Sequence, residues 1–414
     1  MRPLHHALLQ ATVCSAVLAT ASPPGSSVEP RWRSAIDPLE RELGISIPQD
    51  GSALREVRLP SRYFLKGVTA CGDRDGDGAD DFLVRATHWR YCGEDMSRDL
   101  AHLVSGRTGR VLARDFDWNE LRHDVGDEGV DGATRWIRLS FDSSSSDLQL
   151  RSSLDAEPIW QRSSVESGRT FYCARFVGDM DGDGFSDVAA SNGWERHPLS
   201  GRKVGSVSLF SGATGSEIWS IQGDRNSGGF GLAVARVPGP RFDRDDDGVP
   251  DMVVLEDSFR SKADPKRIHV LSGRDGTRLE VFEFHAEADG IEPIDGVGLG
   301  LAGALKVVSI DDGEPAADLS AWQTLTPAPG GRSALTRPDA DDPGLLEVAV
   351  LSEGGVRTIG RAPLPEAEVR AAHLGDFDDD GLDEVLLTHR SEGRHGSAGP
   401  TGGGPAIRIL ELLR

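Results

Sequence analysis

The chain has 414 residues, of which 50 are glycine, 23 are proline and only 6% are aromatic, a composition that favours an all-β fold with many turns over a helical bundle. Aspartate and glutamate number 67 against 45 lysines and arginines, and the formal net charge of −22 repels the phosphate backbone of nucleic acids. We therefore expect no nucleic-acid partner.

The N-terminal segment, residues 1–21, has the pattern of a secretory signal. Arg2 precedes a mostly apolar stretch that ends in Ala19-Thr20-Ala21, an A-x-A cleavage pattern. We expect the segment to direct export to a secreted, periplasmic or cell-surface location and then to be removed; whether the chain stays attached to a surface is left open. No later segment has the roughly 18 consecutive apolar residues of a membrane span, so we expect none in the mature chain.

Residues 22–60 are expected to form a linker with one short helix near residues 37–43, and a strand contributed to a neighbouring sheet is the alternative.

Residues 61–414 contain four copies of one pattern: acids at positions 1, 3, 5 and 9, glycine at position 6, and an apolar run after position 9. The composition predicts only about 0.03 chance occurrences of this pattern, so the copies indicate a repeated unit. The acids are Asp73, Asp75, Asp77 and Asp81; Asp179, Asp181, Asp183 and Asp187; Asp243, Asp245, Asp247 and Asp251; and Asp376, Asp378, Asp380 and Glu384.

Carboxylates on alternate residues of a tight loop can all face one centre, where they repel one another unless a cation binds. Ca²⁺ accepts about 6–8 oxygen ligands from carboxylates, backbone carbonyls and water. We therefore expect about four Ca²⁺ sites that act as structural staples. The variable position 7 is consistent with a ligand that is only a backbone carbonyl, and its residues are Ala79, Phe185, Val249 and Leu382.

An EF-hand shares the acids at positions 1, 3 and 5 and the glycine at position 6, but it also requires glutamate at position 12 and flanking helices. Position 12 is apolar in all four copies, and the following residues favour strands. We therefore reject the EF-hand. The residues at position 12 are Val84, Ala190, Val254 and Leu387.

A Ser-Gly-x-x-Gly turn follows the first three loops, at residues 105–109, 211–215 and 272–276, and β-rich stretches flank it. One unit is therefore a strand, an acidic loop, a second strand and a hairpin, which is the plan of a propeller blade. Counting weaker copies near Ile310 and Asp339, we expect a β-propeller of about seven, between six and eight, four-stranded blades over residues 61–414. Whether these two weaker loops bind metal is left open. Residues 406–413 are expected to form a strand that closes the ring by joining the first blade.

The acidic loops, the short apolar strands and Gly229-Phe230-Gly231 resemble the FG-GAP repeats of integrin-α-like propellers and the VCBS repeats of secreted bacterial proteins. The resemblance covers residues 60–115, 165–285 and 368–388. It implies that the acids at positions 1, 3, 5 and 9 of each loop bind Ca²⁺.

Cys14 would leave with the signal segment, and an oxidising compartment would then permit one disulfide among Cys71, Cys92 and Cys173. The pairing of Cys71 with Cys92 is the local choice, and the other pairings stay open. Trp160 is expected to pack between blades, with carbohydrate stacking as the alternative.

The sequence has no G-x-S-x-G elbow, P-loop, zincin helix or dinucleotide fingerprint. We therefore expect a monomeric interaction, adhesion or scaffold module and not an enzyme, with an unidentified protein or glycan as partner. The alternative is a secreted propeller hydrolase or lyase that acts on polysaccharide, because propellers host both classes.

Overall fold

The structure is a computed structural model that divides the chain into two units, residues 1–42 and 43–414. It describes residues 44–46, 55–58, 63–88, 98–117, 120–128, 131, 134–141, 145–154, 156–164, 169–196, 201, 203–224, 229–237, 243–257, 265–284, 290–294, 298–302, 307–309, 317, 319–322, 324–326, 333–352, 355–363, 369–376, 384–389 and 406–412. The expected signal segment, the expected helix near residues 37–43, and Cys92, Asp378, Asp380 and Leu382 lie outside these residues. No helix in the described ranges is both long and apolar enough to cross a bilayer.

The described residues of the second unit form seven antiparallel sheets, numbered here in chain order. Sheet 1 contains β3 (Tyr63–Gly72), β4 (Asp81–His88), β5 (Arg98–Val104) and β6 (Val111–Asp117); sheet 2 contains β7 (Glu120–Glu128), β8 (Thr134–Phe141), β9 (Ser146–Arg151) and β10 (Pro158–Ser163). Sheet 3 contains β11 (Cys173–Gly178), β12 (Asp187–Asn192), β13 (Ser206–Phe210) and β14 (Glu217–Gln222); sheet 4 contains β15 (Phe230–Arg236), β16 (Met252–Glu256), β17 (Lys266–Leu271) and β18 (Arg278–Phe284).

The remaining three sheets are less regular. Sheet 5 contains β19 (Gly290–Ile294), β20 (Gly298–Ala302) and β21 (Val307–Val308); sheet 6 contains β22 (Thr324–Thr326), β23 (Ser333–Pro338), β24 (Leu345–Ser352) and β25 (Gly355–Pro363). Sheet 7 contains, from its inner to its outer edge, β26 (Val369–Gly375), β27 (Glu384–His389), β28 (Ala406–Glu411), β2 (Arg55–Arg58) and β1 (Gly44–Ser46).

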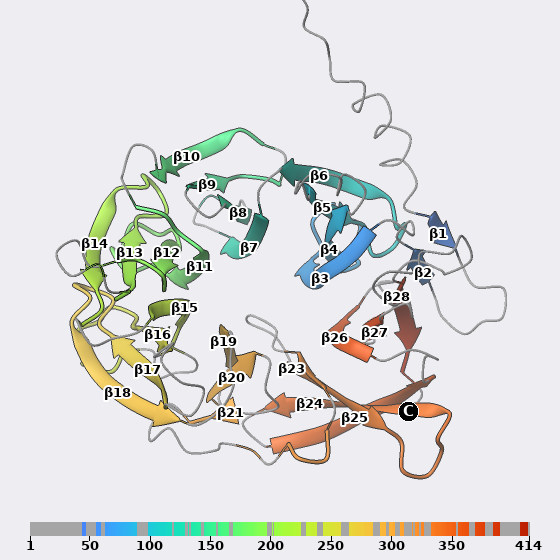
Figure 1. Cartoon of the computed structure of the whole chain (residues 1–414). Coiled ribbons are helices and arrows are strands. Elements are labelled where there is room, and N and C mark those ends of the chain that lie inside the picture. The colour runs from blue at the N-terminus through green and yellow to red at the C-terminus, as the bar shows by residue number, and fades with distance from the viewer. Residues whose placement is uncertain are drawn as a thin grey trace, which may run out of the picture. The chain divides into compact units, whose positions relative to one another are not determined.

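The hydrophobic core lies between neighbouring sheets. The second strand of a sheet is buried on both faces, as in β12, where every residue is buried. This explains the apolar run Val188-Ala189-Ala190 at its centre. Seven clusters of buried side chains each join one sheet to the next, from sheets 1 and 2 round to sheets 7 and 1. The second unit is therefore a closed β-propeller, as expected from the sequence, and Figure 1 shows its sheets in this cyclic order.

The ring closes in sheet 7 through strands from both parts of the chain. β2 pairs with β28 in the register Arg55↔Ile409 and Val57↔Ile407, and β1 pairs with β2. The segment 22–60 thus supplies two strands, which is the alternative that the sequence left open. The expected strand near residues 406–413 exists as β28, but it is the third strand of sheet 7 and does not join the first blade. The N-terminal strands β2 and β1 extend sheet 7 beyond β28.

Two tryptophans tie neighbouring sheets together at the Ser-Gly turns. The indole N–H of Trp160, on the outer strand of sheet 2, donates to the carbonyl of Gly212 in sheet 3 at 3.2 Å. Trp219, on the outer strand of sheet 3, donates in the same way to Gly273 in sheet 4 at 2.8 Å. Both tryptophans are 8% exposed, so the packing role expected for Trp160 is confirmed.

The disulfide expected between Cys71 and Cys92 is wrong, because Cys71 is a free thiol. Cys71 lies at the end of β3, where its thiol donates to the carbonyl of Thr69 at 3.3 Å. Burial raises the pKa of this thiol to about 12. Cys173 is also buried and free. Both cysteines therefore act as small core side chains.

Removal of β1 and β2 should destabilise the propeller, because it leaves the backbone of β28 without a partner along its outer edge. We expect a chain of residues 61–414 to melt at least about 10 °C below residues 22–414. Residues 43–414, which keep both strands, are the control and should melt with the longer chain. Circular dichroism melting of the three chains tests this, and equal midpoints for all three would contradict the closure.

Candidate metal centres

The acidic loops lie at one equivalent place in their sheets. Residues 73–81, 179–187 and 243–251 each connect the first strand of a sheet to the second, and residues 376–384 make the same connection between β26 and β27. The Ser-Gly turns connect the third strand to the fourth, which brings them to the same end of the sheet as the loops. Of the fourth loop, the structure describes only Asp376 and Glu384. The sequence pattern therefore predicted the topological position of all four loops.

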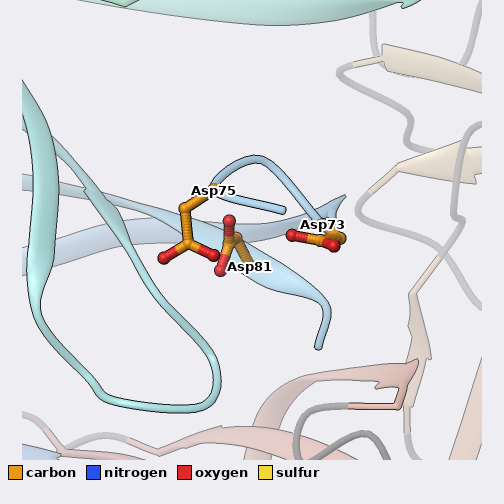
Figure 2. A group of neighbouring side chains, drawn as sticks. All are labelled: Asp73, Asp75 and Asp81. Carbon is orange, nitrogen blue, oxygen red and sulfur yellow. The ribbon is translucent and has the colours of Figure 1, made fainter. Parts of the chain in front are cut away.

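Three acids of each fully described loop converge on one centre. At positions 1, 3 and 9, one carboxylate oxygen from each residue lies within 4.8 Å of the other two. Figure 2 shows the first group, with its three carboxylates turned toward one another. The groups are Asp73, Asp75 and Asp81; Asp179, Asp181 and Asp187; and Asp243, Asp245 and Asp251.

The acid at position 5 does not belong to these groups and is held by other partners. In the second loop, Asp183 Oδ1 accepts the N–H of Phe185 at 2.9 Å, and Asp183 Oδ2 accepts the hydroxyl of Ser211 at 3.1 Å. In the third loop, Asp247 Oδ2 pairs with Nε of Arg274 at 2.6 Å. The hydrogen bond from the Arg274 guanidinium lowers the pKa of Asp247. The position 7 residues thus donate backbone N–H groups to position 5.

The acid at position 1 shapes the loop by accepting backbone N–H groups. Asp179 Oδ1 accepts from Gly182 at 2.8 Å and from Asp183 at 3.1 Å, and its Oδ2 accepts from Gly184 at 2.9 Å. Gly184, at position 6, has a φ of 89°, a conformation that side chains with a Cβ rarely adopt. The glycine and the acid are therefore both needed for the same turn.

The acid at position 9 joins the loop to the Ser-Gly turn. Asp187 is fully buried; its Oδ1 accepts the N–H of Gly212 at 2.7 Å, and its Oδ2 accepts that of Met180 at 2.8 Å. Asp81 and Asp251 are also fully buried and make the equivalent pairs of hydrogen bonds. One carboxylate thus links the connection between strands one and two to the connection between strands three and four.

The hydrogen bond between the turn and the position 9 acid explains why the second residue of the Ser-Gly turn is glycine, a requirement that the sequence alone did not reveal. A Cβ at Gly212 would lie 2.2 Å from the carbonyl oxygen of Ser186, and one at Gly273 would lie 1.8 Å from that of Pro250. Only glycine lets the turn approach the loop closely enough to bond position 9. A nearly constant separation from the position 9 acid was the available signal, being 25, 25 and 22 residues in the three sheets.

Each centre concentrates negative charge at a buried carboxylate. Burial, followed in smaller measure by the acids at positions 3 and 5, raises the pKa of Asp187 to about 7, although the N–H groups of Gly212 and Met180 lower it. Burial likewise raises the pKa of Asp81 and of Asp251 to about 6. A bound cation would favour the ionised form of all three.

The donor set fits a hard divalent cation. All the converging atoms are carboxylate oxygens, the ligand type that suits Ca²⁺, Mg²⁺ or Mn²⁺, whereas structural zinc sites are built from cysteine and histidine. Three carboxylates leave room for backbone carbonyls and water in the coordination shell.

The weaker copy at residues 339–347 is not equivalent to the metal loops. It connects β23 to β24, the second and third strands of sheet 6, and none of its residues has a positive φ. Asp339 pairs with Nε of Arg361 at 2.5 Å, and Glu347 pairs with Nε of Arg337 at 2.7 Å. Arginines therefore neutralise the acids at positions 1 and 9 of this match. Of the other weaker copy, residues 310–318, the structure describes only Ala317.

No family model and no curated protein matches the chain in sequence. Among solved structures, the Dos1 propeller is similar with a TM-score of 0.45, 9% identity, and coverage of 86% of this chain and 95% of that one. BamB from Moraxella catarrhalis has a TM-score of 0.36 and 11% identity, covering 77% and 94%. The rhamnogalacturonan lyase YesW has a TM-score of 0.34 and 13% identity, covering 85% and 90%.

Substitution at position 9 should destabilise the second loop without metal, whereas substitution at position 3 should not. Asp187→Ala leaves two buried backbone N–H groups without acceptors. We therefore expect the free energy of unfolding, measured in chelator, to fall by about 3 kcal/mol. Asp181 is exposed, so Asp181→Asn should stay within about 0.5 kcal/mol of the parent in chelator. Urea unfolding of both variants measures the difference, and equal losses would show that position 9 has no special structural role.

Proposed function

We propose that the chain is an exported calcium-binding β-propeller that serves as an interaction, adhesion or scaffold module, with Ca²⁺ as a structural staple. The observation that carries this proposal is the convergence of three carboxylates in each fully described acidic loop. The signal-like pattern at residues 1–21 supports export, and extracellular fluids supply calcium at concentrations that weak sites require.

Calcium in these loops would strengthen the link that the position 9 carboxylate makes between the loop and the Ser-Gly turn. The cation would hold positions 1 and 3 against the position 9 acid, which in turn bonds the Ser-Gly turn. All four strands of a sheet would then be tied at one end. A metal that binds only the folded state stabilises it by about 2.7 kcal/mol at a hundred times its dissociation constant.

The proposed ligands are the acids at positions 1, 3, 5 and 9 of each loop and the backbone carbonyl at position 7. In the fourth loop this set is Asp376, Asp378, Asp380, Leu382 and Glu384. Its connection between the first and second strands of sheet 7 supports the same function there. We propose about four calcium ions for the whole chain.

A binding role is supported over catalysis by the full sequence, which contains no G-x-S-x-G elbow, P-loop, zincin helix or dinucleotide fingerprint. The partner would be a protein or a glycan, and the net charge of −22 argues against nucleic acid. A propeller provides a rigid ring that presents loops at its two ends, which suits such a module.

Calcium should raise the melting temperature of the parent protein, and chelator should lower it again. In Asp181→Asn/Asp183→Asn this calcium-dependent shift should become smaller, because the second loop loses two charged ligands. Calorimetric melting with calcium and with chelator measures the effect. Asp341→Asn, in the loop neutralised by arginine, is the control and should keep the full shift. Unchanged melting of the parent protein in calcium and chelator would count against structural calcium.

Polysaccharides incubated with the calcium-loaded protein should keep their chain length, because a binding module cleaves no bond. Size-exclusion chromatography and an assay for new reducing ends, run over a panel of acidic and neutral polysaccharides, provide the measurement. A sample without protein is the control. Progressive shortening of any polysaccharide would favour the hydrolase or lyase instead.

A further inference from the structure

The third residue of the Ser-Gly turn differs between the loops and lies where it can reach the acid at position 5. It is Arg107 in sheet 1, Ala213 in sheet 3 and Arg274 in sheet 4. The turn approaches the loop closely because its glycine bonds the acid at position 9. The long side chain of Arg274 reaches the acid at position 5 from the turn side.

In sheet 4 this residue brings a positive charge into the third loop. Arg274 Nε lies 2.6 Å from Asp247 Oδ2, and Arg274 Nη2 donates to the carbonyl of Asp247 at 2.6 Å. The Arg274 side chain is 59% exposed and that of Asp247 is 21% exposed. The guanidinium thus occupies the carboxylate oxygen that position 5 would offer to a metal.

In sheet 3 the corresponding contact is neutral. Asp183 Oδ2 accepts a hydrogen bond from the hydroxyl of Ser211 at 3.1 Å, and Ala213 carries no charge. The backbone frame is the same in the two loops: position 5 donates its N–H to position 1 at 3.1 Å in both. The other arginine of the third loop, Arg244, is engaged by Glu280 at 2.8 Å. The contact at position 5 is therefore a clear difference in charge between the two centres.

We propose that the third residue of the Ser-Gly turn sets the calcium affinity of the loop it faces, so that Arg274 makes loop 243–251 bind more weakly than loop 179–187. Calcium must break the Arg274–Asp247 ion pair to gain a fourth carboxylate, and it then lies beside a positive charge. Both effects oppose binding. This inference rests on the proposed calcium sites.

Reciprocal substitutions at the two turns test the proposal. Arg274→Met removes the charge and keeps a long side chain, and we expect it to raise the calcium affinity of the third loop about tenfold at low salt. Ala213→Arg should lower the affinity of the second loop by a similar factor. Arg274→Lys and Ala213→Met are the matched controls, since one keeps the charge and the other adds length alone, and both should stay close to the parent.

Terbium luminescence excited through tryptophan, with calcium as the competing ion, can report each loop separately. Trp160 packs at the turn of the second loop and Trp219 at the turn of the third. The third loop is measured with the other three silenced by Asp73→Asn/Asp75→Asn, Asp179→Asn/Asp181→Asn and Asp376→Asn/Asp378→Asn. The second loop is measured with Asp243→Asn/Asp245→Asn in place of its own pair of substitutions. Circular dichroism confirms that each variant is folded.

The salt dependence of the calcium affinity provides a second test of the role of Arg274. The exposed pair is screened by salt, so the ratio of affinities between Arg274→Met and the parent should fall toward one in 1 M sodium chloride, where the screening length is about 3 Å. A simple change in packing would leave this ratio unaffected by salt.

Three outcomes are distinguishable. Calcium binding at both loops with affinities that follow the charge at residues 213 and 274 supports the proposal. Calcium binding at both loops with affinities unchanged by these substitutions overturns the proposal and leaves the calcium sites intact. Failure of the parent protein to bind terbium or calcium at millimolar concentrations overturns the proposed function and this inference with it.

Discussion

A buried carboxylate that accepts backbone N–H groups from two connections holds the end of each metal-loop sheet together. In sheet 3, Asp187 bonds Met180 on the loop and Gly212 on the turn, and it lies in the core where an unbonded acid would be costly. The loop path, the close approach of the turn and the convergence of the other acids all depend on this placement. These hydrogen bonds thus form a frame in which a cation could bind.

The same turns also connect neighbouring sheets. Trp160 and Trp219 donate to Gly212 and Gly273, whose own N–H groups bond the position 9 acids. At the closure of the ring, the N–H of Asp80 in the first loop donates to the carbonyl of Asp376 in the fourth at 2.7 Å. A cation bound in one loop would therefore stabilise a region that contacts the next sheet. Calcium would act on the ring and not only on single blades.

The sequence predicted the features that depend on local spacing. It predicted the four loops, the apolar strands after them and the propeller class, because these follow from a short repeated pattern. It left open whether the weaker copy at residues 339–347 binds metal, because the spacing recurs there, and long-range pairing places this loop between β23 and β24. It also missed the pairing of β2 with β28, since a strand of four residues has too little pattern to recognise. The orientation of the Asp247 side chain could not be predicted from the sequence either, because it depends on a contact with Arg274, which is 27 residues away.

We propose that the acidic loops hold calcium within the carboxylate groups described above. Anomalous X-ray diffraction from crystals grown with calcium tests it most directly, because the anomalous peaks locate each ion without assumptions about its ligands. We predict one peak between positions 1, 3 and 9 in each of the loops 73–81, 179–187 and 243–251, and one in loop 376–384. Crystals soaked in calcium whose loops lack such peaks, or whose ions lie only elsewhere, would contradict the claim.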